Sequence, residues 1–262
     1  VMDLSTSGVF ADAAYYETIH AGKQQNVAAD FRVKKYRLDF SMGLNLTGSA
    51  KVYVDRSELK SYRFTLYHGY KVKQVTDQTG AALDFRREHD YVTVTRGEAA
   101  VEYLCLEYTG KSPKYYSSYA GVCLPANFAY YPIPGYRELF KDSFYGFIDC
   151  SLPYDTAFDV RCSGRKQMYC NLAARGDNHF AGNARSITLL SGYYDTLKLN
   201  DTLVVYPKYA DGEIRARIKK NMGTFTKEHR DIRTIFIMDA DNLTPYEHLR
   251  SYDGYVVTNS MI

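Results

Sequence analysis

Histidine is a frequent zinc ligand, and the chain has six histidines. A catalytic site of the H-E-x-x-H type needs two histidines four residues apart on one helix. The histidines have no such spacing at positions His20, His68, His89, His179, His229 and His248. The sequence therefore predicts no zinc site and no other metal or cofactor.

Other residues with chemical potential lack the partners that the chemistry requires. Glu88-His89-Asp90 could form an acid–base cluster, but it lies in a charged run before a strand, where a solvated turn is the better interpretation. Asp239 and Asp241 resemble the start of a calcium loop, without its glycine and distal glutamate. The chain also lacks the G-x-S-x-G, G-x-G-x-x-G and Walker motifs. We expect no catalytic residue in this chain.

The five cysteines are odd in number and contain no C-x-x-C pair. Cys162 and Cys170 flank a turn-like segment, residues 163–166. If that segment is a hairpin, the two cysteines are cross-strand neighbours, and a disulfide is one prediction. The alternative is that they remain reduced thiols.

Tyrosine is unusually abundant, with 26 residues against no tryptophan. The plain interpretation is sheet composition, because tyrosine favours half-buried strand positions. The alternative is a wet aromatic surface that binds a ligand. Its candidate residues are Tyr115, Tyr116, Tyr119, Tyr130, Tyr131 and Tyr136.

The charge distribution excludes a nucleic-acid interface, because 33 basic residues are scattered among 30 acidic ones and give a net charge of +3. No run of about 18 apolar residues is present, so we expect no transmembrane segment in this chain. The sequence begins at Val1 and its last residues read as an interrupted strand. We therefore expect a piece of a longer protein.

The elements that must position any site are mostly strands. Between residues 36 and 109, apolar and polar side chains alternate with a period of two, as in Tyr36-Arg37-Leu38-Asp39-Phe40. Gly80 ends a turn signal, Asp77 to Gly80, which predicts a hairpin. A second group of strands is predicted between residues 144 and 207.

The pattern changes after Pro207. Residues 212–229 have apolar side chains at helical spacing, at Ile214, Ile218, Met222 and Phe225. Strands are predicted at 234–238 and 255–258. We therefore predict a mainly-β protein with three units: a leader or linker (1–31), a large antiparallel β-sandwich or saddle (32–208), and a short, incomplete α/β segment (209–262).

The order of segments resembles the N-terminal β-saddle domain of M1-family (gluzincin) aminopeptidases, including the aminopeptidase-like ectodomains of bacterial ABC-permease-type membrane proteins. The similarity is carried by short motifs spread over residues 32–258. They are Tyr36-Arg37-Leu38-Asp39-Phe40, Phe64-Thr65-Leu66, the stretch from Val72 to Gly80, Tyr108-Thr109-Gly110, Leu124-Pro125 with Tyr131-Pro132, and Ser191-Gly192-Tyr193. After residue 209 the chain is similar to the opening of the family's catalytic domain.

The departures from the family decide the predicted function. The zinc motif H-E-x-x-H and the substrate-binding loop G-x-M-E-N are both absent. We therefore predict that the chain is not an enzyme. The first hypothesis is a non-catalytic, extracytoplasmic domain of a bacterial permease-like membrane protein, tethered to the membrane through the rest of that protein, with a peptide or protein partner or a structural role.

Two alternatives belong to other classes. The chain could instead be the N-terminal portion of a zinc aminopeptidase whose metal-binding part lies elsewhere. A third interpretation is a carbohydrate-binding β-sandwich, which requires tyrosines in a row on one exposed sheet face.

Overall fold

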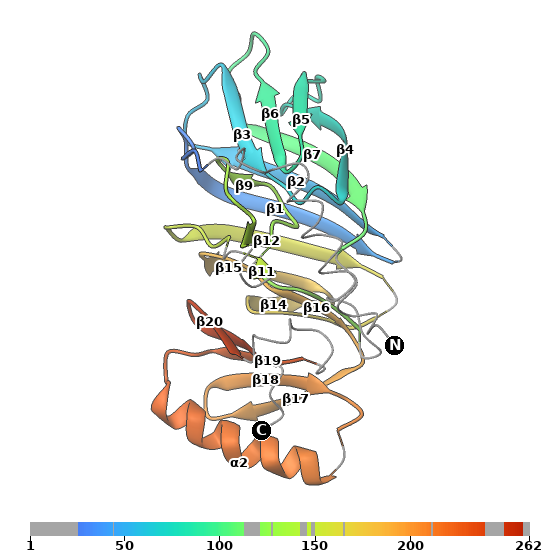
Figure 1. The fold of residues 1–262 in the computed structure, drawn as a ribbon, viewed down its shortest axis with the longest axis vertical. Helices are drawn as coiled ribbons and strands as arrows, with labels where there is room; N and C mark the ends of the chain where they lie inside the picture. The colour runs from blue at the N-terminus through green and yellow to red at the C-terminus, as the bar shows by residue number, and fades with distance from the viewer. Residues whose placement is uncertain are drawn as a thin grey trace.

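A seven-stranded sheet forms the centre of the protein (Figure 1). The computed structural model describes residues 26–43, 45–112, 121–126, 128–141, 146–147, 150–164, 166–210, 212–238 and 249–258. In spatial order the strands of this sheet are β14 (Ala173–Gly176), β15 (His179–Ala184), β12 (Thr156–Ser163), β1 (Val33–Met42), β2 (Leu46–Val54), β7 (Tyr103–Gly110) and β4 (Tyr70–Thr76).

The alternation predicted from the sequence sets the two faces of this sheet. In β2 every second residue from Leu46 to Val54 is buried, and in β1 the buried residues include Tyr36, Leu38 and Phe40. The residues that alternate with them along each strand face outward. The inner face therefore supplies half of the main core, and the outer face remains polar.

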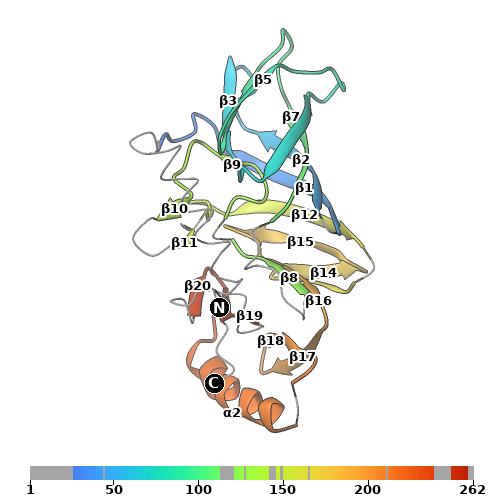
Figure 2. The same ribbon diagram turned by 45° about the vertical axis from the view of Figure 1, so that its right-hand side comes forward.

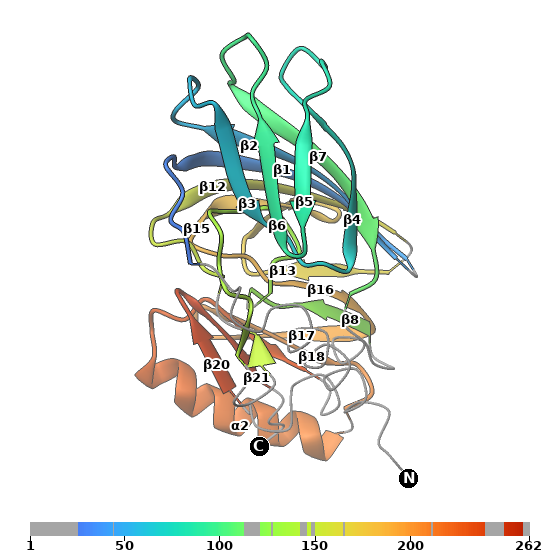
Figure 3. The same ribbon diagram turned by 45° about the horizontal axis from the view of Figure 1, so that its top comes forward.

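A four-stranded sheet covers the inner face and completes a sandwich, as Figure 3 shows. Its strands in order are β5 (Phe85–Glu88), β6 (Tyr91–Thr95), β3 (Ser61–Thr65) and β9 (Ile133–Pro134). Tyr62 and Phe64 of β3 pack on Phe31, with ring centroids 5.2 and 5.4 Å apart. The predicted turn before Gly80 is present: Gly80 has φ +85°, and its backbone N–H donates to the Asp77 carbonyl at 3.1 Å.

Two smaller sheets lie beside the sandwich (Figure 2). One has the order β13 (Met168–Cys170), β16 (Leu189–Gly192), β8 (Gly121–Leu124). The other pairs β10 (Phe140–Lys141) with β11 (Gly146–Phe147). The prediction of a mainly-β fold is confirmed.

The C-terminal part is a five-stranded mixed sheet with one helix on it. Its order is β17 (Tyr194–Leu199), β18 (Thr202–Pro207), β19 (Thr234–Ile237), β21 (Tyr255–Thr258) and β20 (Leu249–Tyr252). Strands β18, β19 and β21 are parallel, and α2 (Gly212–Glu228) makes the crossover from β18 to β19. This sheet begins at Tyr194, so it includes two strands from before the predicted unit boundary at residue 208.

Side-chain alternation in the five-stranded sheet separates two clusters. In β19, Ile235 and Ile237 face α2, where Ile218 and Met222 pack on them. The residues between them face the opposite way, and Phe236 packs with Leu190 of the three-stranded sheet. The α/β unit therefore shares an apolar core with the β unit and is not attached by a linker alone.

Candidate functional site

The histidines in the described part of the chain do not converge on a metal site. Within the ranges given above, no group of three histidine, cysteine, aspartate or glutamate side chains could hold a metal ion. His68 and His179 each contact a carboxylate instead: His68 Nδ1 lies 3.1 Å from Asp90 Oδ1, and His179 Nε2 lies 2.9 Å from Asp159 Oδ1. His20 and His248 fall outside the described residues. The residues described here do not fit a zinc ion.

The Glu88-His89-Asp90 segment is a turn, but it is not wholly solvated as predicted. His89 has φ +53° and connects β5 to β6. Asp90 is buried, and its Oδ1 accepts a 2.6 Å hydrogen bond from the backbone N–H of His68. The carboxylate is buried because it fixes the neighbouring loop, which is a structural role.

Three of the six candidate tyrosines lie in the described part of the chain. Tyr115, Tyr116 and Tyr119 fall outside it. Tyr130 and Tyr131 are buried, with exposed fractions of 0% and 1%. The ring of the half-buried Tyr136 lies tilted against the Tyr91 ring, with centroids 4.6 Å apart, and its hydroxyl is hydrogen-bonded to Thr93 Oγ1. Tyr130 and Tyr131 therefore do not contribute to an exposed aromatic surface.

The core tyrosines are held by their hydroxyl groups. Tyr130 Oη donates to the carbonyl of Ile187 at 2.7 Å, and Tyr108 Oη donates to the carbonyl of Tyr130 at 2.9 Å. Burial raises the pKa of Tyr130 and of Tyr131 well above the ordinary tyrosine value. The rings of Tyr130 and Tyr108 thus fill the core while their hydroxyls donate to backbone carbonyls.

The two cysteines considered for a disulfide are free thiols in the structure. Cys162 lies on β12 of the seven-stranded sheet and Cys170 on β13 of the three-stranded sheet, so they are not cross-strand neighbours in one hairpin. Burial raises the pKa of each thiol to about 12. These environments are those of inert core thiols.

The structural feature best suited to binding is the outer edge of the five-stranded sheet. Among the described strands, β20 is the last in the order of this sheet and pairs antiparallel with β21. In this register Leu249 and Ser251 direct their backbone groups away from β21, because backbone direction alternates along an antiparallel strand. Leu249 is 51% exposed. The edge can accept an extended chain through backbone hydrogen bonds.

The β unit holds this edge in place. Tyr255, opposite the end of β20, stacks on Tyr252 with ring centroids 4.7 Å apart. Its hydroxyl lies 3.0 Å from Ser186 Oγ and accepts from Thr188 Oγ1 at 3.2 Å. Arg185 adds an ion pair at 3.4 Å to Asp253 in the β20–β21 turn. Side chains from the connection between β15 and β16 therefore fix the position of the β20–β21 hairpin.

The sequence predictions do not include β20, although they include β21. The signal is present as Asp253-Gly254, a dipeptide typical of hairpin turns, between Tyr252 and Tyr255. Gly254 has φ +78°, as such a turn requires.

Comparisons with known proteins support the fold at low sequence identity. No protein-family model matches the chain, and no curated protein matches it. Among solved structures, leukotriene A4 hydrolase from Saccharomyces cerevisiae is similar with a TM-score of 0.62 and 10% identity, over 98% of this chain and 45% of that one. The chain therefore spans less than half of that enzyme.

Two bacterial structures give the same result. An M1 zinc metallopeptidase from Deinococcus radiodurans is similar with a TM-score of 0.53 and 12% identity, over 90% of this chain and 63% of that one. An aminopeptidase N family protein from Idiomarina loihiensis is similar with a TM-score of 0.55 and 8% identity, over 85% of this chain and 42% of that one. The predicted resemblance to the N-terminal β domain of M1 aminopeptidases is confirmed as a fold.

One prediction is corrected by these findings. The chain was predicted not to be an enzyme, yet the solved structures that share its fold are zinc metallopeptidases and hydrolases. The absence of an H-E-x-x-H motif from this chain does not decide the matter, because the chain covers only part of those enzymes. Among the described residues, no helix has the length and apolar character to cross a membrane.

Proposed function

We propose that this chain is the N-terminal portion of an M1-type zinc aminopeptidase and contributes a peptide-binding edge to it. The observation that carries the proposal is that the similarity includes both the β unit and the α/β unit. The similarity to these enzymes extends over 85–98% of the chain. A β-sandwich used only as a binding module would not need the mixed sheet packed against it.

The role proposed for the α/β unit is to hold a substrate in extended form. Leu249 and Ser251 offer outward backbone groups on β20, and a peptide strand added there would continue the sheet. The metallopeptidase from Deinococcus radiodurans has been crystallised with a Tyr-Ser-Ala substrate, which makes a short peptide the first ligand to try.

The zinc chemistry is assigned in this proposal to a segment other than the residues described here. The described residues contain no cluster that could hold the metal. In this proposal their role is to bind and orient the peptide. Zinc, when bound in such an enzyme, polarises the scissile carbonyl and lowers the pKa of a bound water.

The proposal is tested on the natural polypeptide that contains this chain. We expect stoichiometric zinc by elemental analysis and hydrolysis of aminoacyl coumarin amides that stops when 1,10-phenanthroline removes the metal. A natural polypeptide that contains no zinc and hydrolyses none of these substrates would contradict the proposal.

The peptide-binding edge has its own test. Ser251→Pro removes one outward N–H of β20, and we expect the KM for tripeptides to rise about tenfold, as expected for one or two lost hydrogen bonds. The control is Lys198→Pro on β17, the opposite edge strand, which is also exposed. An equal effect of both substitutions would show that the change acts through the sheet and not through bound peptide.

Tethering to a permease-like membrane protein outside the cytoplasm stays a proposal drawn from the same resemblance. It is checked by fractionating cells and testing whether an added protease reaches the chain in intact cells.

A further inference from the structure

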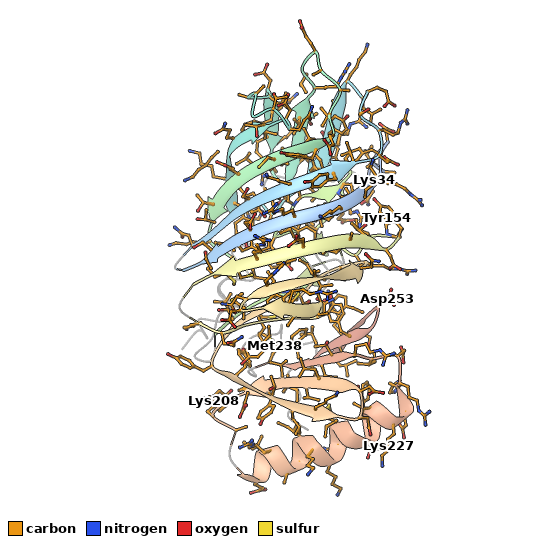
Figure 4. The ribbon with its side chains drawn as sticks, turned by 180° about the vertical axis from the view of Figure 1, so that it is seen from behind. Lys34, Tyr154, Lys208, Lys227, Met238 and Asp253 are labelled. Carbon is orange, nitrogen blue, oxygen red and sulfur yellow. The ribbon has the colours of Figure 1, made fainter. Side chains whose placement is uncertain are left out.

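The outer face of the seven-stranded sheet has side chains sorted into rows by chemistry. Strands β7, β2, β1 and β12 lie next to one another in the sheet. Figure 4 views this face directly, with no described helix or strand in front of it. Outward residues two apart along a strand are about 6.8 Å apart, so four successive rows span about 20 Å.

The first two rows carry hydroxyls and carboxylates. The hydroxyl row is Thr109, Thr47, Ser41 and Ser163. The acidic row is Glu107, Ser49, Asp39 and Arg161. All of these residues except Thr109, together with Lys73 of β4, line a shallow hollow of about 460 Å³. Its lining combines these polar side chains with apolar surface from Phe40 and Tyr108.

The next row carries two cations that form no ion pair with any other described residue. Lys51 of β2 lies opposite Arg37 of β1, which lies opposite Asp159 of β12. Asp159 is already occupied by His179 at 2.9 Å and Arg161 at 3.8 Å. Arg37 Nε is buried and has no hydrogen-bond partner among the described residues. This row therefore offers hydrogen-bond donors for which the described residues supply no acceptor.

The last row places two aromatic residues beside Lys35 of β1 and Ala157 of β12. Tyr103 and Tyr53 are cross-strand partners with ring centroids 4.9 Å apart, and both are half-buried. Lys51 lies 5.2 Å from the Tyr103 ring, and Lys35 lies 5.8 Å from the Tyr53 ring. The sequence candidates do not include either tyrosine, although they alternate with buried residues on adjacent strands.

We propose that this face binds an acidic oligosaccharide, a sugar chain that contains uronic acid units. Carboxylates accept hydrogen bonds from sugar hydroxyls, and serine and threonine hydroxyls both donate to them and accept from them. Arg37 and Lys51 supply the cations that a uronate carboxylate needs, and an arginine can bind a carboxylate through two parallel hydrogen bonds. The Tyr53–Tyr103 pair offers ring surface to a sugar ring.

The same rows disfavour other anionic polymers. Asp39 and Glu107 would repel phosphates and the side chains of an acidic peptide, which offer these carboxylates no hydroxyl donors to offset the repulsion. These strands are inner strands whose backbone groups are paired on both sides, so a peptide cannot add to them by strand pairing. A uronate chain uses the acidic row and the cationic row at once, because it carries both hydroxyls and carboxylates.

The test is calorimetric titration of the 262-residue chain with oligogalacturonate, a neutral oligogalactose of the same length and polyglutamate. We expect saturable oligogalacturonate binding that is at least about tenfold tighter than binding of either other polymer. Arg37→Gln and Lys51→Gln should each weaken it about tenfold, as loss of one charge-assisted contact predicts.

Arg86→Gln is the matched control, since Arg86 is an exposed arginine on β5 of the other sheet. It should leave oligogalacturonate affinity unchanged, and thermal melts of all variants separate folding defects from lost binding. The proposal is overturned if oligogalacturonate does not bind, if polyglutamate or oligogalactose binds as tightly, or if Arg86→Gln weakens binding as much as Arg37→Gln.

Discussion

The abundance of tyrosine is explained at the scale of single residues. Tyr36, Tyr108 and Tyr130 are fully buried, and each donates its hydroxyl to a backbone carbonyl from another part of the chain. Tryptophan could fill similar volume, but its single N–H is placed differently on the ring. Tyrosine here combines core filling with satisfaction of irregular backbone between the sheets.

The Tyr130 hydroxyl should therefore be measurable in stability. Tyr130→Phe leaves the Ile187 carbonyl unpaired in the core, and we expect the free energy of unfolding to fall by about 1–3 kcal/mol. Urea denaturation measures the change. Tyr193→Phe is the control, because Tyr193 is 60% exposed, and it should change stability by no more than about 0.5 kcal/mol. Equal losses of unfolding free energy in the two variants would mean that the buried hydroxyl stabilises the fold no more than an exposed one.

At the scale of elements, β2 depends on one glycine. A Cβ on Gly48 would lie 2.5 Å from the ring of Tyr108, its cross-strand partner on β7. The ring crosses the glycine to reach the Tyr130 carbonyl, so the strand pair and the hydroxyl contact are one arrangement.

Gly48→Ala should consequently lower the free energy of unfolding by about 1–3 kcal/mol through overpacking. Gly176→Ala on β14 is the control, because nothing lies within 4 Å of the added methyl group. Thermal denaturation of the two variants gives the comparison. A Gly48 variant as stable as the Gly176 variant would show that the Tyr108 ring moves aside without cost.

The elements that local pattern predicts well are those with strict periodicity. Ile218 and Met222 repeat at helical spacing, and the predicted helix 212–229 matches α2 within one residue. Strand 234–238 and strand 255–258 are likewise confirmed within one residue. In these segments local burial alone determines the side-chain pattern.

Pairing between distant strands could not be predicted from the sequence. Strand β1 pairs in parallel with β12, about 120 residues later, and no local feature of Tyr36 or Phe158 encodes that register. The polar rows of the outer face follow from the same pairing. Asp39 and Arg161 are far apart in the sequence, and only the β1–β12 pairing places them opposite each other.

The whole molecule should unfold as one body. Phe236 and Tyr255 of the α/β unit pack with Leu190 of the β unit in one cluster. We expect coincident urea transitions by far-ultraviolet circular dichroism and by hydrogen exchange of the β19 amides. Tyr255→Phe, which removes contacts to Ser186 and Thr188, should shift both transitions together. Loss of β19 protection at a urea concentration that leaves the β sheets intact would refute this.

The buried tyrosines also make the stability of the fold depend on pH in alkaline solution. Burial holds the pKa of Tyr36, Tyr108, Tyr130 and Tyr131 well above the ordinary value of about 10, so these phenols stay neutral while the protein is folded. Their contribution to stability is complete below about pH 10 and is lost as the pH rises, because only the unfolded chain releases those protons. In a chain without tryptophan, ultraviolet absorbance of tyrosinate in alkali should therefore rise first for exposed rings and then in one step as the sheets separate.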